Sequence, residues 1–196
     1  MKVGMIFECA DEGPDFKVCA HLAKLIRPEI TVVPDALGNK RNMLVECGES
    51  AAALLAGGCG KVLIIWDLFP SFKRNEDPCL HRDRELIFES LAEAGVDLGR
   101  VELICIEAEL ETWLVAEYIA VRDVIRQWSP KANIGRLKRA LESNDPKEIL
   151  DRLFREHAKR PYQPHLHAEE IIKAMPNLRR LKRVQSFQRF ESKLMS

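Results

Sequence analysis

Acidic side chains follow two short apolar runs of the sequence, at the point where each run ends. Glu8 comes directly after residues 2–7, and Asp67 is the last residue of the run 61–67. Apolar runs without polar alternation are typical of strands buried on both faces of a parallel sheet, and ligands bind at the carboxyl edge of such a sheet. Carboxylate oxygens suit hard divalent cations such as Mg²⁺ or Mn²⁺. We therefore expect an acidic metal site at this edge.

The loop after Glu8 adds further carboxylates. Asp11, Glu12 and Asp15 follow it, together with a single glycine, Gly13. Nucleotide-binding loops are rich in glycine because backbone N–H groups must approach the phosphate, whereas these acids would repel a phosphate unless a cation lay between them. The loop argues against a Rossmann or P-loop site and favours metal binding. Attraction of acids to a helix N-terminus is a simpler explanation, which covers Asp11 and Asp15 but not Glu8 at a strand end.

The elements that position these acids are predicted from the spacing of apolar residues. Short β-branched runs predict strands, and helical spacing closed by proline or glycine predicts the helices between them. Strands and helices alternate, which implies parallel crossovers and an α/β fold with a mostly parallel four-stranded sheet in Rossmann-like layers. The turn-rich segment 34–42 is expected to be a loop. The expected strands are 2–7, 30–33, 61–67 and 101–106, and the expected helices are 16–26, 43–55 and 81–94.

The remainder of the chain, residues 121–196, is predicted to be a basic helical extension packed on an α/β domain of residues 1–120. Residues 1–120 hold 12 Lys and Arg against 21 Asp and Glu, and residues 121–196 hold 18 against 9, although the net charge is zero. Mutual attraction of the two parts is the simpler explanation, and an acidic metal site beside a basic surface for a polyanion is the sharper one. The extension is expected to contain helices at 137–141, 149–154 and 168–174 and a basic closing segment at 178–194.

Four segments carry a wider resemblance. They are 8–12 (Glu-Cys-Ala-Asp-Glu), 106–117, 130–131 and 186–190. In this order they resemble a TOPRIM-like family of uncharacterised function that is related to OLD-type nucleases. The family's pattern is Glu-Gly-x-Thr/Ser-Glu, then an acidic-x-Trp-Leu segment, then C-terminal signatures. The first segment matches at both acids and differs at Cys9 and Asp11.

The resemblance implies a TOPRIM-type site that binds Mg²⁺ or Mn²⁺ and hydrolyses phosphodiesters. The expected catalytic acids and metal ligands are Glu8, Glu12, Asp67 and Glu111, with Glu109 as a further ligand. The family pattern predicts an acid at the second position of Asp-x-Asp, where this chain has Phe69, which cannot bind a metal. We expect Glu109 or Glu111 to supply the missing oxygen. A TOPRIM-like binding or regulatory subunit without catalytic activity is the alternative.

The resemblance also implies a nuclease domain that acts on nucleic acid, in phage defence and with a separate ATPase as partner. The residues expected to contact the phosphate backbone are Lys40, Arg41, Arg179, Arg180, Lys182 and Arg183. Such contacts give affinity without sequence specificity. A solvated helix face explains the basic cluster at 179–183 equally well. A third class, a small-molecule α/β binding protein, is disfavoured by the acids of the first loop.

Cysteine usage and hydropathy bear on location. The six cysteines form no CxxC pair, and the first apolar run is too short for a signal peptide, so a reduced, cytoplasmic protein is expected. No apolar run approaches the roughly 20 residues that cross a bilayer, so no membrane span is expected.

Overall fold

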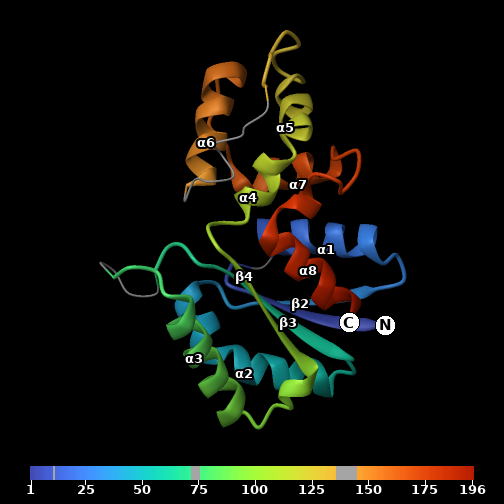
Figure 1. Cartoon of the computed structure of the whole chain (residues 1–196), viewed down its shortest axis with the longest axis vertical. Coiled ribbons are helices and arrows are strands. Elements are labelled where there is room, and N and C mark those ends of the chain that lie inside the picture. Colours follow the sequence, from blue (N-terminus) through green and yellow to red (C-terminus); the bar gives the residue numbers. More distant parts are fainter. Residues whose placement is uncertain (11, 72–75, 136–144) are drawn as a thin grey trace.

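A computed structural model gives the fold and describes residues 1–10, 12–71, 76–135 and 145–196 (Figure 1). In the first half, strands alternate with helices. They are β1 (Lys2–Phe7), α1 (Pro14–Ile26), β2 (Thr31–Ala36), α2 (Lys40–Ala56), β3 (Lys61–Asp67), α3 (Leu80–Glu93), the short 3-10 helix η1 (Leu98–Arg100) and β4 (Val101–Ile106). Helices follow in the second half. They are α4 (Glu111–Ala116), α5 (Tyr118–Ile125), α6 (Pro146–Leu153), the π-helical turn η3 (Phe154–Ala158), α7 (Pro164–Lys173), the 3-10 helix η4 (Leu181–Arg183) and α8 (Gln185–Met195).

The four strands form one parallel sheet in the order β2-β1-β3-β4. The predicted α/β fold class is therefore confirmed. The register pairs Phe7 of β1 with Ile65 of β3, and Asp67 of β3 with Ile106 of β4. The carboxyl ends of these three strands consequently lie along a single edge of the sheet.

Strand β2 differs from its prediction. It continues through Pro34 to Ala36, and Pro34 pairs with Met5 of β1, so the expected loop begins later than predicted. Proline lacks the N–H that a central strand must donate, but β2 is an edge strand and has a neighbour on one side alone. The edge position therefore tolerates a residue that is typical of turns.

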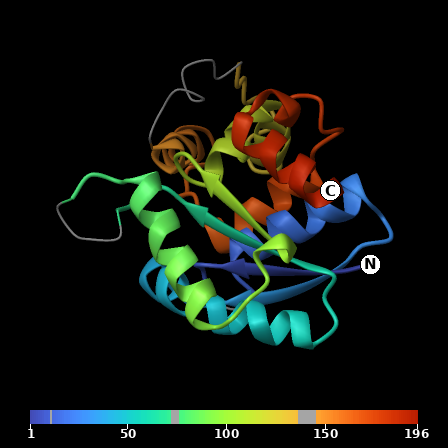
Figure 2. The ribbon, with the colours of Figure 1, turned by 60° about the horizontal axis from the view of Figure 1, so that its bottom comes forward.

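The sheet separates two hydrophobic clusters, because successive side chains of each strand point to opposite faces. Met5 and Phe7 belong to a cluster that includes residues of α1, α4, α5, α7 and α8, whereas Ile64 and Trp66 belong to a cluster with α2 and α3. Figure 2 shows α2 and α3 on one side of the sheet and α1 with the C-terminal helices on the other.

Helices α2 and α3 approach each other closely at Gly48. The Gly48 N–H donates to Ser90 Oγ at 2.9 Å, and a Cβ at position 48 would lie 2.0 Å from the Ser90 carbonyl oxygen. Helix α2 begins at Lys40, three residues before the predicted start, because the Asn39 side chain accepts a hydrogen bond from the Asn42 N–H. This earlier start places Lys40 on the first turn of the helix.

The C-terminal helices pack on the sheet domain, α7 against α1 and α8 against β4. Phe187 and Phe190 are fully buried, with ring centroids 5.5 and 5.4 Å from Trp113. Trp113 Nε1 donates to Ser186 Oγ at 2.9 Å, which satisfies the buried indole. The expected helices at 149–154 and 168–174 correspond to α6 and α7, and the one expected at 137–141 lies outside the described residues. Within the described segments, no helix has the length and apolar character of a membrane span.

Candidate metal centre at the carboxyl edge of the sheet

Glu8 and Asp67 lie together at the carboxyl edge of the sheet. Glu8 is the first residue after β1, Asp67 is the last residue of β3, and the two strands are neighbours. The Glu8 carboxylate accepts a hydrogen bond from the backbone of Asp67, and the Asp67 carboxylate accepts one from the backbone of Leu110. Both side chains are partly buried. The strand ends thus bring two expected acids into one site.

A third carboxylate, Asp15, joins them from the first turn of α1. The turn before this helix is tight, since the Gly13 N–H donates to the Ala10 carbonyl oxygen at 2.9 Å, and a Cβ at position 13 would lie 2.6 Å from Cys9 Sγ. The negative charge of Asp15 raises the pKa of both Glu8 and Asp67. From the sequence, attraction to the helix dipole explains why an acid stands at position 15. The structure places this acid beside the ends of β1 and β3.

We call Glu8, Asp15, Asp67 and Glu111 the acidic cluster. Burial is the largest cause of a raised pKa for each member. It raises the pKa of Glu8 to about 8, and burial followed by repulsion from Glu109 raises the pKa of Glu111 to about 7. The pKa of Asp67 lies well above its ordinary value because burial is reinforced by the charges of Asp15, Glu8 and Glu111. Simultaneous ionisation of these groups is unfavourable without a cation.

Two carboxylate oxygens at this edge, Glu8 Oε2 and Glu109 Oε2, are buried and have no hydrogen-bond partner among the described residues. An unpartnered buried oxygen is costly, and a donor set made of carboxylates suits Mg²⁺ or Mn²⁺. In the described segments, no three acidic, histidine or cysteine side chains lie close enough together to hold an ion. The donor chemistry thus suits the ion, but the spacing of the described side chains does not form a site for it, and an ion would bind here only if the carboxylates moved closer together.

The other predicted ligands lie at the margin of the acidic cluster. Glu109 is partly buried and its charge raises the pKa of Glu111. Glu12 is exposed and has a left-handed backbone, with a φ of 57°. Asp11 lies outside the described residues. The structure therefore associates Glu109 with the buried acids and leaves Glu12 at the surface.

Tyr162 reaches the acidic cluster from the C-terminal half of the chain. Its hydroxyl donates to Glu111 Oε1 at 3.3 Å, and its side chain is buried. Burial and then the charge of Glu111 raise the pKa of Tyr162 well above its ordinary value, so the hydroxyl keeps its proton and remains a donor. The sequence holds no signal for this contact, because the partners are 51 residues apart and in different elements.

Lys40 is buried beneath the segment that follows β3. Its ammonium donates to the carbonyl oxygens of Asp67, Leu68 and Pro70 at 2.9, 2.8 and 3.0 Å. It also forms an ion pair with Asp83 at 3.0 Å, and Trp66 Nε1 donates to the same carboxylate at 3.2 Å. The Lys40 ammonium thus faces four groups of the protein itself, and its contact with nucleic acid stays a prediction. No sequence pattern singles out Asp83 as a partner of Lys40.

Phe69 stands where the TOPRIM-like pattern has its second acid. Its side chain is partly buried. The Leu68 N–H donates to the Ile106 carbonyl oxygen at 2.7 Å, and the Phe69 N–H donates to the Ala108 carbonyl oxygen at 3.2 Å. The segment after Asp67 therefore runs alongside the end of β4, and its backbone is held by β4 on one side and by Lys40 on the other.

The remaining basic residues of the prediction occupy different environments. Arg41, Arg179 and Arg183 are exposed. Lys182 pairs with Glu191 at 2.7 Å, and Arg180 pairs at 2.8 Å with Glu117, which is fully buried. Arg180 thus compensates a buried charge, whereas the exposed members present their charge to solvent.

Comparison with known proteins identifies the fold. No family model matches the sequence, and no curated protein matches it. Among solved structures, the chain is similar to the C-terminal region of the Burkholderia pseudomallei OLD protein, with a TM-score of 0.53 and 15% identity over 98% of this chain and 96% of that one. It also matches the C-terminal region of the Xanthomonas campestris pv. campestris OLD protein, with a TM-score of 0.45 and 16% identity over 99% and 95% of the two chains.

The first of these matches shows that the chain has the fold of the C-terminal region of an OLD protein. The predicted resemblance to OLD-type nucleases is confirmed at the level of the fold. An identity of 15% carries the fold alone, so the chemistry must be argued from the residues of this chain.

Proposed function

We propose that the chain is a TOPRIM-like, divalent-metal-dependent nuclease domain that hydrolyses phosphodiesters of nucleic acid. The observation that carries the proposal is the buried, unpartnered Glu8 Oε2 beside Asp67, at the sheet edge where the charges of several acids oppose one another. Strongly perturbed carboxyl groups in one site are typical of functional centres. A bound Mg²⁺ or Mn²⁺ would relieve this repulsion.

Glu8 and Asp67 are assigned as ligands of the ion, with Asp15 beside them. Such an ion would supply Lewis-acid polarisation of the phosphodiester and would lower the pKa of a water. Glu111 is suited to accept the proton of the attacking water, because its pKa of about 7 lies near physiological pH and its orientation is fixed by Tyr162. Glu109 supports the site from its margin.

Positive side chains bind the phosphates of the substrate. Lys147, an exposed residue of α6, is near enough to Glu111 and Glu109 for its charge to lower the pKa of both carboxyl groups. Arg41, Arg179, Lys182 and Arg183 are assigned to the backbone of the nucleic acid, where contacts add affinity in any sequence. A separate ATPase as partner, and a part in phage defence, belong to this proposal on the resemblance alone.

A catalytically inactive binding or regulatory subunit is the second candidate. Phe69 favours it, because a phenyl ring supplies no oxygen at the second position of Asp-x-Asp. Lys40 favours it as well, since its ammonium already lies close enough to Glu8 to lower the pKa of that carboxyl group. In this case the acidic cluster would bind a cation or a basic partner without hydrolysis.

Cleavage of plasmid and single-stranded DNA, with Mg²⁺ or Mn²⁺, separates the two candidates. We expect cleavage by the wild type, loss of cleavage in Glu8→Ala and Asp67→Ala, and wild-type rates in Glu46→Ala, which removes an exposed acid of α2. Equal cleavage by all four proteins would refute the assignment of the site. Metal-dependent DNA binding without cleavage in the wild type would support the inactive subunit.

A further inference from the structure

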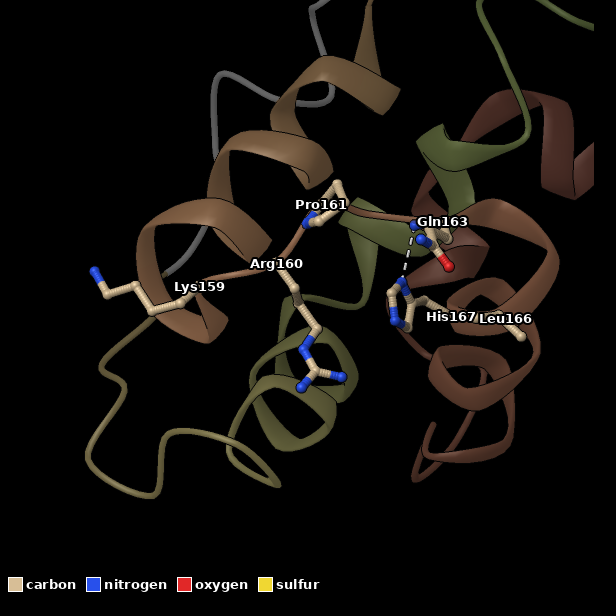
Figure 3. A pocket seen from close by; sticks show the side chains of 6 residues that line it. All are labelled: Lys159, Arg160, Pro161, Gln163, Leu166 and His167. Atoms are coloured by element: carbon tan, nitrogen blue, oxygen red, sulfur yellow. Dashed lines mark hydrogen bonds between the residues drawn. The ribbon is translucent and has the colours of Figure 1, made fainter.

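A cavity of about 230 Å³ lies between the end of η3 and the first turns of α7 (Figure 3). It is lined by Lys159, Arg160, Pro161, Gln163, Leu166 and His167. Pockets for drug-sized ligands usually enclose roughly 300–1,000 Å³, so this cavity suits a small chemical group. Among the described residues that line it there is no carboxylate. The cavity therefore offers positive charge and hydrogen-bond donors to a small ligand.

His167 presents one of these donors from a buried position. Its side chain lies 95% buried, being 5% exposed, and its Nδ1 accepts a hydrogen bond from the Gln163 N–H at 2.9 Å (Figure 3). Because Nδ1 is the acceptor, the proton of the neutral ring is assigned to Nε2. Within the described residues, the hydrogen bond of the imidazole is made at Nδ1, which leaves Nε2 for a ligand. The ring, which packs against Phe154 and lies edge-on to Trp128, thus lines the cavity with an N–H group.

Arg160 presents a second, preorganised donor. Its guanidinium carbon lies 4.5 Å from the centroid of the Trp128 ring, so one face of the guanidinium rests on the indole. Stacking leaves the N–H groups at the guanidinium edge available, and that edge matches two oxygens of a phosphate. Lys159 also lines the cavity, but its side chain points away from Arg160 and His167 (Figure 3), and its ammonium donates to the Glu156 carbonyl oxygen at 2.8 Å.

The cavity is connected to the acidic cluster by Tyr162. This residue lies between Arg160 and Gln163 in the sequence, its ring centroid is 5.8 Å from that of His167, and its hydroxyl binds Glu111. A group in the cavity and a group at the acidic cluster would therefore flank one side chain.

We propose that this cavity binds a phosphate group of the nucleic-acid backbone, held by the Arg160 guanidinium and the His167 Nε2–H. The assignment of the phosphate to nucleic acid rests on the proposed function, whereas the recognition of phosphate rests on the cavity itself. The positive end of the α7 dipole adds to the attraction. The cavity is a second contact point for the substrate, separate from the acids.

Trp128 provides a reporter for the test, because it is partly buried beneath Arg160 while Trp66 and Trp113 are 2% and 0% exposed. Wild-type protein is titrated in EDTA with inorganic phosphate and, in a second arm, with a single-stranded oligonucleotide. Tryptophan fluorescence reports the first arm, and fluorescence anisotropy of a labelled oligonucleotide reports the second. EDTA removes any contribution from a metal.

The test variant is Arg160→Gln, and the matched control is Arg84→Gln, an arginine stacked at 5.8 Å on the Phe88 ring of α3. Arg160→Gln is expected to lower the affinity for both ligands by about tenfold, because one charge-assisted contact is lost. It is also expected to reduce the salt slope of DNA binding by about 1. Arg84→Gln is expected to match the wild type. Equal affinities of all three proteins for both ligands would overturn the proposal.

One further result is decisive. Loss of phosphate binding with unchanged oligonucleotide binding in Arg160→Gln would show that the cavity takes free phosphate, which overturns its assignment to the backbone. Both titrations are made in EDTA, so neither depends on the metal site or on cleavage. The cavity would then stand even if no protein cleaved DNA, so its failure and that of the proposed function are distinguishable.

Discussion

Two groups of buried charge meet at the carboxyl edge of the sheet, and they are treated in different ways. Lys40 and Asp83 form a compensated group, in which the ammonium has four acceptors and the carboxylate has two donors. The acidic cluster is compensated only in part. Lys40 and Lys147 oppose the rise in the pKa of Glu8 and Glu111, but burial and mutual repulsion outweigh them, and Glu8 Oε2 has no partner in the described segments. Compensated charges hold a structure in place, whereas incompletely compensated ones are typical of sites that wait for a ligand.

The largest effect is expected from breaking the compensated group. Lys40→Met keeps most of the side-chain stem but leaves Asp83 as an unpaired buried charge and removes the donor of three carbonyl groups. We expect the free energy of unfolding to fall by about 3–5 kcal/mol, measured by urea denaturation.

The adjacent residue provides the control for this change. Arg41 is exposed, so Arg41→Met should alter the free energy of unfolding by no more than about 0.5 kcal/mol. A loss below about 1 kcal/mol in Lys40→Met would mean that the ion pair does not stabilise the segment after β3.

A substitution within the acidic cluster is expected to raise the free energy of unfolding instead of lowering it. Glu8→Gln removes a carboxyl whose pKa of about 8 in the folded protein exceeds its ordinary value of 4.5. Such a group favours the folded state below about pH 4.5, and this contribution is lost as the pH rises to about 8, because the unfolded chain ionises first. Glu8→Gln should therefore raise the stability at pH 8 by about 1–2 kcal/mol, or the Tm by several degrees.

The pH profile sharpens this prediction. The Tm of the wild type should fall between pH 5 and pH 9, and the fall should be smaller in Glu8→Gln. Glu46→Gln, on the exposed side of α2, should keep the wild-type slope. Parallel profiles for wild type and Glu8→Gln would contradict the raised pKa of Glu8.

Metal binding offers an intermediate effect and separates two acids of the first loop. In the proposed site, Mn²⁺ at ten times its Kd stabilises the protein by about 1.4 kcal/mol, or roughly 3–6 °C in Tm. Asp15→Asn should abolish most of this shift in Tm, because the charge of Asp15 lies close enough to Glu8 and Asp67 to raise the pKa of both. Glu12→Gln should keep the shift, because Glu12 is exposed. Calorimetric scans at pH 8.5 measure the Mn²⁺-induced shift in Tm of both variants. Loss of the shift in Glu12→Gln and its retention in Asp15→Asn would place the ion at the loop surface.

The smallest effect is expected at the hydroxyl of Tyr162. Tyr162→Phe keeps the ring against Phe154 and His167 and removes a single 3.3 Å hydrogen bond to Glu111. A loss of about 1 kcal/mol or less in the free energy of unfolding is expected from urea denaturation. A much larger loss would show that the hydroxyl also restrains the acidic cluster.

The sequence predicts the sheet and the two acids at its strand ends because both follow from local pattern. Apolar runs specify the strands, and a parallel sheet sends Glu8 and Asp67 to one edge. The spacing of apolar residues does not decide which residue of a first helical turn lies inward. For this reason the sequence explains Asp15 by its attraction to the helix dipole and not by a place in the site. Tyr162 and Asp83 reach the site through tertiary packing, which periodicity cannot report.

Strand β2 and Lys40 illustrate the same limit. Pro34 predicts a turn from its own chemistry, but its position at the edge of the sheet decides the outcome. Lys40 looks like a surface cation because lysine is rarely buried, and the carbonyl groups after β3, together with Asp83, make its burial favourable. In both cases a neighbour distant in the sequence overrides the local preference.

The contact between Gly48 and Ser90 has a consequence for how this protein can vary. Helix α2 carries Lys40 and helix α3 carries Asp83, so the spacing of the two helices sets the length of their ion pair. A methyl group at position 48 would wedge the helices apart and draw the two charges away from each other. The absence of a side chain at position 48 thus keeps α2 and α3 close enough for the ion pair between Lys40 and Asp83. Substitutions at position 48 are therefore limited by an ion pair that Gly48 does not contact.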